Sequence, residues 1–129
     1  MATSRSYQDL FVWQKAMDLV ERTYRVTRDW PKDELYGLTN QVRRASVSIP
    51  ANIAEGQGRG GQKEFLHFLM IANGSLYELE THLLIAQRLC YVDAPICMSL
   101  SSQAAEVGRL LHGLIRSIRD PSLSEAPRP

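Results

Sequence analysis

Few residues of this chain could carry out chemistry, and their spacing forms no known catalytic pattern. His67, His82 and His112 are not spaced to pair with one another, or with a cysteine, as metal ligands. Glu64 and His67 form one Glu-x-x-His unit, but di-iron bundles use two, and the chain has no second copy. No serine or cysteine nucleophile has a recognisable base partner. We therefore predict a non-enzymatic protein with no catalytic residue, metal or cofactor.

The segment from Gly56 to Gly61 satisfies the G-x-G-x-x-G pattern of dinucleotide-binding loops. That pattern is meaningful only between a strand and a helix of a βαβ unit, and here a helical pattern precedes it. We interpret the segment as a connection between two helices.

Four stretches of the chain have the spacing of amphipathic helices, with apolar residues recurring at steps of three and four. Pro31, the glycine segment, Pro95 and Pro121 separate or end them, and no stretch alternates like a β-strand. The expected helices cover about residues 9–29, 33–55, 62–90 and 95–119. In the first, the expected core stripe comprises Leu10, Trp13, Met17, Val20 and Tyr24; the second is expected to start near Asp33, with Leu35 in its stripe.

Short connections make consecutive helices antiparallel neighbours, so these elements predict an all-α, up-down-up-down antiparallel four-helix bundle. The 129 residues suffice for one domain, which we place at residues 1–120. Residues 121–129 are expected to form a disordered C-terminal tail.

Composition favours a cytoplasmic protein that does not enter membranes. The longest apolar run, Phe68–Ala72, is far shorter than the ~20 residues of a membrane span, and no leader-like segment precedes the first helix. Cys90 and Cys97 are expected to be free thiols in a reducing compartment. The formal net charge is +1, with 12 arginines and 3 lysines, so the chain as a whole does not attract nucleic acid strongly.

The second expected helix carries a polar stripe beside its apolar one. Serine and asparagine are weak helix formers, so their presence here suggests a hydrogen-bonding role. One interpretation is a surface for a partner chain or for phosphates, and the other is an exposed face with some hydrogen bonds between helices. The polar stripe comprises Gln41, Arg44, Ser48, Asn52 and Glu55; Arg43 lies beside it, and Arg59 and Lys63 extend it through the following loop.

The third expected helix has more apolar residues than one core stripe requires. Leu66, Met70, Tyr77 and Leu84 form a second apolar line, offset around the helix by roughly 100° from the core stripe. Burying these four side chains could contribute ~6–10 kcal/mol before association costs. The second apolar line indicates a self-association interface, or alternatively a wide core stripe.

Four segments resemble the bacterial four-helix bundle proteins of the ribosomal-RNA intervening-sequence type, and are also similar to accessory variability proteins of diversity-generating retroelements. They are Phe11–Ala16, Leu38–Ala45, Ser48–Gly56 and Phe68–Glu80, and the S-I-P-A-N-I-A-E-G run of the third is highly specific. The resemblance spans about residues 9 to 118.

The resemblance implies a bundle that assembles into a homopentameric ring and contacts nucleic acid. In the retroelement relatives it also implies a partnership with reverse transcriptase through a basic surface. Those relatives are strongly basic and this chain is nearly neutral, so we expect only weak nucleic-acid binding. By position, the residues that match the family motif are Gln41, Arg43, Arg44, Ser48, Asn52, Glu55, Gly56 and Arg59, together with Ser75, Glu78 and Glu80.

Two functional hypotheses follow. The first is a homo-oligomeric scaffold on which Arg43, Arg44, Arg59 and Lys63 form a weak basic surface for RNA or DNA. The second is a protein–protein adaptor without nucleic-acid binding, for example an accessory to a larger nucleic-acid enzyme.

Overall fold

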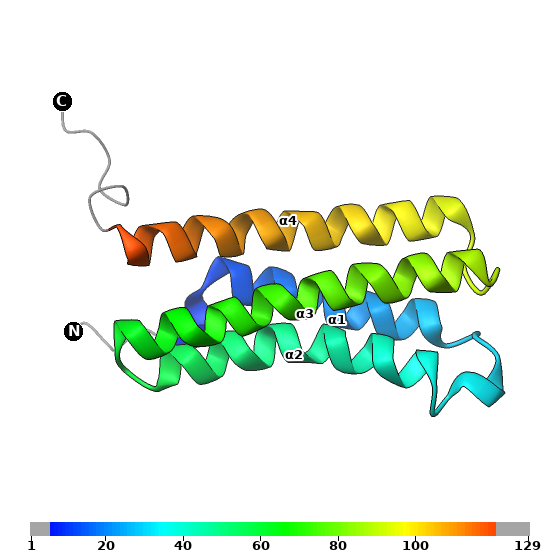
Figure 1. Ribbon diagram of the computed structural model, residues 1–129, viewed down its shortest axis with the longest axis horizontal. Helices are drawn as coiled ribbons and strands as arrows, with labels where there is room; N and C mark the ends of the chain where they lie inside the picture. The colour runs from blue at the N-terminus through cyan, green and yellow to red at the C-terminus, as the bar shows by residue number, and fades with distance from the viewer. Residues whose placement is uncertain (1–5, 121–129) are drawn as a thin grey trace.

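The computed structural model describes residues 6–120, and over this range the chain is all-α (Figure 1). Four long helices lie along one common axis, as predicted from the sequence for a four-helix bundle (Figure 1). The expected tail at 121–129 lies outside the described residues. The elements are two 3-10 turns, η1 (Tyr7–Asp9) and η2 (Lys32–Glu34), and four α-helices, α1 (Phe11–Thr27), α2 (Leu38–Gly58), α3 (Gln62–Arg88) and α4 (Ala94–Arg119).

Each helix packs against two others: α1 and α3 both contact α2 and α4, and the most extensive contact joins α2 to α3. The order around the bundle is therefore α1, α2, α3, α4. As a result, the side formed by α1 and α2 lies opposite the side formed by α3 and α4. This arrangement decides which exposed residues can share a surface.

The core takes a stripe of side chains from every helix. Leu19, Ile49, Leu79 and Leu111, one from each helix, are completely buried. Burial of such a side chain contributes roughly 1.5–3 kcal/mol, so one continuous core holds all four helices together.

The core stripe predicted for α1 is confirmed only in part, since Leu10 and Trp13 pack, partly buried, against the core. The buried residues of α1 include Leu19, Thr23 and Thr27, whereas Met17 and Tyr24 lie on the flank of the helix and are exposed. Threonine can occupy the core here because its hydroxyl group donates to the carbonyl one turn earlier: Thr23 Oγ1 to Leu19 O at 2.7 Å, and Thr27 Oγ1 to Thr23 O at 2.9 Å. A prediction based only on apolar residues misses such threonines, because it does not consider that their hydroxyl groups can bond to the backbone of the same helix.

The start predicted for the second helix is also wrong, because α2 begins at Leu38. Glu34 is not in the first turn of the helix but precedes it, in η2. From there its Oε1 accepts a hydrogen bond from the Leu38 N–H at 3.0 Å, which satisfies one of the free donors of the helix terminus. Leu35, expected in the core stripe, is exposed in the connection.

The glycine segment, predicted to connect two helices, does so only in its second half, because α2 continues to Gly58 and residues 59–61 join it to α3. Its first glycine has a packing role. Gly56 is buried inside α2, where an added Cβ would lie 2.7 Å from the Cβ of Phe68. The missing side chain therefore allows α2 and α3 to approach closely. Gly60, with φ of 87°, supplies the left-handed residue of the turn that follows.

Candidate functional site

The middle of the polar stripe is part of the contact between α2 and α3. The hydroxyl groups of Ser48 and Ser75 lie 2.8 Å apart across the two helices. Asn52 Nδ2 donates to the Ser48 carbonyl at 2.8 Å and to its hydroxyl at 2.9 Å. Ser48 and Asn52 therefore take part in hydrogen bonding within and between helices, as the second interpretation of the stripe anticipated.

Arg43 lies on the other flank of α2, toward α1. Its Nε donates to Thr27 Oγ1 at 2.8 Å, and its guanidinium carbon lies 4.7 Å from the centroid of the Tyr24 ring. Arg43 therefore packs between helices and does not share a surface with Arg44.

Arg59 and Lys63 lie at the opposite end of α2 from Arg44. Arg59 forms an exposed ion pair with Glu55, at 2.8 Å, and its guanidinium stacks 5.1 Å from the centroid of the Phe68 ring. Lys63 is exposed in the first turn of α3. The four cations proposed as one basic surface are thus distributed over three places on the molecule.

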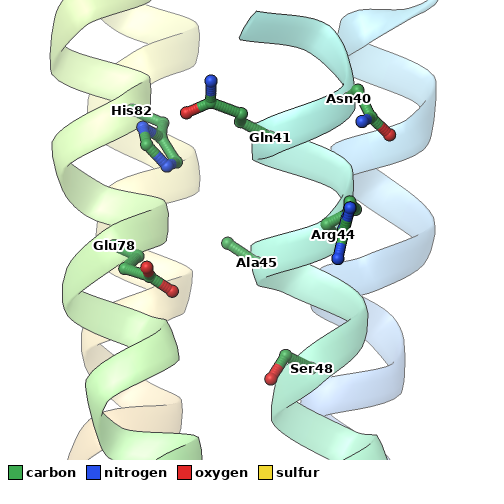
Figure 2. Close-up of a pocket in the computed structure, with 7 residues that line it drawn as sticks. All are labelled: Asn40, Gln41, Arg44, Ala45, Ser48, Glu78 and His82. Carbon is green, nitrogen blue, oxygen red and sulfur yellow. The ribbon is translucent and has the colours of Figure 1, made fainter. Parts of the chain in front are cut away.

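A polar groove opens between α2 and α3 near the start of α2. It has a volume of about 340 Å³. Figure 2 shows Gln41 from α2 and His82 from α3 extending toward each other, Glu78 one turn from His82, and Arg44 on the outer flank of α2. The groove, called the α2–α3 groove below, is lined by Asn40, Gln41, Arg44, Ala45, Ser48, Glu78 and His82.

Four polar side chains of this groove have no partners in the part of the chain that the structure describes, whereas Ser48 bonds to Ser75 and Asn52. Gln41, Arg44, Glu78 and His82 form no side-chain hydrogen bond or ion pair there, and His82 Nδ1 is buried without a partner. An amide, a guanidinium, a carboxylate and an imidazole thus converge on one space with their hydrogen-bonding capacity unused. Such an arrangement is suited to a polar ligand.

Sequence reasoning did not place His82 in this site, and Glu78 entered only as a family-motif residue. A signal was present, because the two residues are four apart and therefore lie on one face of the helix. What the sequence alone could not supply was the register that sets that face against Gln41 and Arg44.

The second apolar line is mostly at the surface. Met70, Tyr77 and Leu84 are 43%, 58% and 55% exposed, whereas Leu66 is partly buried against the core. Beside Tyr77, a hollow of about 210 Å³ lies between α3 and α4, where α4 has the small residues Ala104 and Gly108.

Residues that could support metal or thiol chemistry are dispersed. Within residues 6–120, no group of three or more histidine, cysteine, aspartate or glutamate side chains could hold a metal ion. Both cysteines are free: Cys90 is exposed, and Cys97 is buried with its thiol 3.6 Å from the Leu83 carbonyl oxygen. Over the same range, no helix combines the length and the apolar character that crossing a membrane requires.

Comparison with known proteins gives one similar structure and one matching sequence family. The chain is similar in structure to a protein of unknown function from the S23 ribosomal protein family of Bacteroides thetaiotaomicron, with a TM-score of 0.72 and 24% sequence identity. The alignment covers 81% of this chain and 97% of that one. None of the curated proteins matches the chain. The family model of the 23S rRNA-intervening sequence protein matches residues 8–113, which is most of the sequence, and the chain therefore belongs to that family.

Proposed function

We propose that this protein is a non-enzymatic helical scaffold that self-associates through the second apolar line on α3. The observation that carries the proposal is the exposure of Met70, Tyr77 and Leu84, three large apolar side chains in a row on one helix. A row of this kind, bordered by polar residues, is typical of an interaction site, whereas single exposed apolar residues are ordinary.

The opposite side of the bundle offers a second apolar surface for the same assembly. Met17 and Tyr24 are seven residues apart on one face of α1 and are 43% and 41% exposed. If the α3 line of one copy packs on the α1 flank of the next, both surfaces are buried by one kind of contact. Such a head-to-tail contact closes into a ring when its rotation permits, and the family resemblance implies five copies.

The experiment that tests self-association combines Met70→Glu with Tyr77→Glu. Charges at two buried contact positions should lower the mass measured by light scattering to that of a monomer. Ile71→Glu is the matched control, because Ile71 is 40% exposed and adjacent in sequence but projects from a different face of α3. If the double variant folds and retains the parent mass, the α3 line is not the interface.

A mixing experiment tests the head-to-tail arrangement. Tyr77→Glu damages one face and Tyr24→Glu the other, so each variant alone should fail to assemble. Mixed together, they should form a two-chain complex through the one intact pair of faces. Failure to form that complex would contradict a contact between these two faces.

A second candidate function is weak contact with nucleic acid. It is supported by exposed cations that have no carboxylate partner among residues 6–120, for example Arg44 on α2, Lys63 on α3, and Arg109 and Arg116 on α4. Each chain would neutralise few phosphates, but repetition of the chain in an oligomer multiplies the effective affinity.

The test is fluorescence anisotropy with single-stranded RNA, single-stranded DNA and duplex DNA at low and physiological salt. Combining Arg44→Glu with Lys63→Glu should weaken binding and reduce its salt dependence, since fewer counterions would be released. Arg43 is left intact because its bond to Thr27 is structural. No binding by the parent protein at low salt would favour the adaptor without nucleic-acid binding.

A further inference from the structure

The α2–α3 groove presents opposite hydrogen-bonding requirements within one small space. The Arg44 guanidinium can only donate, and the Glu78 carboxylate, when ionised, can only accept. Gln41 can do both. Neither charge has a partner in the described chain. A ligand that satisfies the groove must therefore bring an anionic group and, a short distance away, hydrogen-bond donors.

The groove is better suited to a compact polar ligand than to a protein surface. Protein interfaces gain most of their free energy from aromatic and aliphatic anchors in apolar pockets. The residues that line the groove are polar, with the single exception of Ala45. The volume of about 340 Å³ lies at the small end of the range for ligand sites, which is appropriate for a single nucleotide.

We propose that the α2–α3 groove binds one unpaired guanine nucleotide of a single-stranded nucleic acid, a proposal that rests on the proposed nucleic-acid contact. The phosphate lies at Arg44, on the outer flank of α2, and the base enters between Gln41 and His82 (Figure 2). Unpaired bases are commonly bound in this way, with their edges hydrogen-bonded and their faces stacked on planar side chains.

The carboxylate of Glu78 selects the base. Guanine presents two adjacent donors, N1–H and the N2 amino group, which match the two oxygens of a carboxylate. The neighbouring O6 of guanine can accept from the Gln41 amide. Adenine and cytosine have a ring-nitrogen lone pair beside their amino group, and uracil has a carbonyl oxygen on each side of its single N–H. Each of these bases would therefore place a partially negative acceptor against the carboxylate, which would repel it.

The test measures binding of labelled uridine nonamers that differ only at the central base. The nonamer with a central guanine should bind about tenfold more tightly than those with adenine, cytosine or uracil, the discrimination typical of a bidentate base contact. Glu78→Gln should abolish this preference, because it weakens binding of the guanine nonamer and removes the repulsion of uracil, so that the all-uridine nonamer binds no more weakly than it does to the parent protein. Glu80→Gln is the matched control, because Glu80 lies beside the hollow between α3 and α4 and should preserve the preference.

The outcomes separate this proposal from the one on which it rests. Binding that is equal for all four nonamers would overturn the guanine site while the nucleic-acid contact stands. No binding of any nonamer at low salt would overturn both. A direct readout is the Gln41 side-chain amide signal in an NMR titration: it should shift with guanosine monophosphate and not with uridine monophosphate, and an unmoved signal would overturn the site.

Discussion

The Tyr91 hydroxyl donates a hydrogen bond to Glu34 Oε2 at 2.8 Å and thereby joins the α1–α2 connection to the α3–α4 connection. The other oxygen of the same carboxylate caps α2 at the Leu38 N–H. The two hydrogen bonds, first that from Leu38 and then that from Tyr91, lower the pKa of Glu34 below its usual value of 4.5. The same bond to Glu34 raises the pKa of Tyr91 above 10.0.

This contact should give Tyr91→Phe a pH-dependent effect on stability. A lowered carboxylate pKa contributes stability above pH 4.5 that is lost as the pH falls through the folded-state value. A raised tyrosine pKa contributes stability below pH 10.0 that is lost as the pH rises through its folded-state value. The parent protein should therefore melt at a higher temperature than Tyr91→Phe across neutral pH, and the difference should shrink at both extremes.

Thermal unfolding followed by circular dichroism from acidic to alkaline pH measures that difference. Tyr36→Phe is the control, because Tyr36 is 91% exposed and its hydroxyl has no partner in the described chain. A difference of constant size from pH 3 to pH 11, roughly a range that spans the ordinary pKa values of both side chains, would contradict the assigned cause.

Gly56 and Gly58, two residues apart in α2, should respond oppositely to alanine. A Cβ on Gly56 would meet the Phe68 Cβ at 2.7 Å and the Phe65 carbonyl oxygen at 3.2 Å, so Gly56→Ala should destabilise by ~1–3 kcal/mol through overpacking. A Cβ on Gly58 meets nothing within 4 Å, so Gly58→Ala should stabilise the helix by about 0.5–1 kcal/mol. Urea unfolding of both variants measures the contrast, and equal effects would mean that the helices adjust to the added methyl group.

The sequence was sufficient to predict the four-helix bundle because apolar periodicity and helix-ending residues act locally. It was insufficient where a polar side chain met its hydrogen-bonding requirement by bonding to the backbone nearby. Thr23 occupies the core although it is polar, since its hydroxyl donates to Leu19 O, and this displaced the buried stripe of α1 from the prediction. The start of α2 was misplaced for a similar reason, because Glu34 caps the helix from outside it.

The candidate site was less predictable than the fold. Helical spacing shows which residues share a face of one helix, but not which residues of another helix that face contacts. Arg43 and Arg44 are adjacent in sequence, yet Arg43 packs on Tyr24 of α1 and Arg44 borders the groove with α3. Ser48, expected to face a partner, bonds to Ser75 within the same chain. Which residues meet depends on how far each helix is rotated in the bundle, and that is decided by the whole core.

The hydrogen bond between Ser48 and Ser75 should appear as coupling in a double-mutant cycle. Each serine-to-alanine change should cost about 1 kcal/mol, since it removes one partner and leaves the other partly buried hydroxyl less well satisfied. With both hydroxyls absent neither serine leaves the other unsatisfied, and Asn52 keeps its bond to the Ser48 carbonyl, so the double variant should cost less than the two single changes added together. Unfolding free energies from urea titration give the four corners of the cycle, and strict additivity would contradict direct coupling.

Cys90 lies two residues after the end of α3 and has a backbone conformation that favours glycine. Its φ of 64° is left-handed, and the turn closes with the Tyr91 N–H donating to Ala86 O at 2.9 Å and the Cys90 N–H donating to Gln87 O at 3.0 Å. This is the helix-ending arrangement in which glycine is usual, because a Cβ in the left-handed region crowds the following carbonyl group.

Cys90→Gly should therefore stabilise the protein by about 0.5–1 kcal/mol, the relief of the left-handed strain less the greater chain entropy of unfolded glycine. Cys90→Ala is the matched control, because it also removes the exposed thiol but keeps the Cβ, and it should change the free energy of unfolding by less than about 0.5 kcal/mol. Urea unfolding under reducing conditions compares the two variants. If alanine stabilises as much as glycine does, the gain comes from losing the thiol, and the backbone conformation at the end of α3 carries no cost.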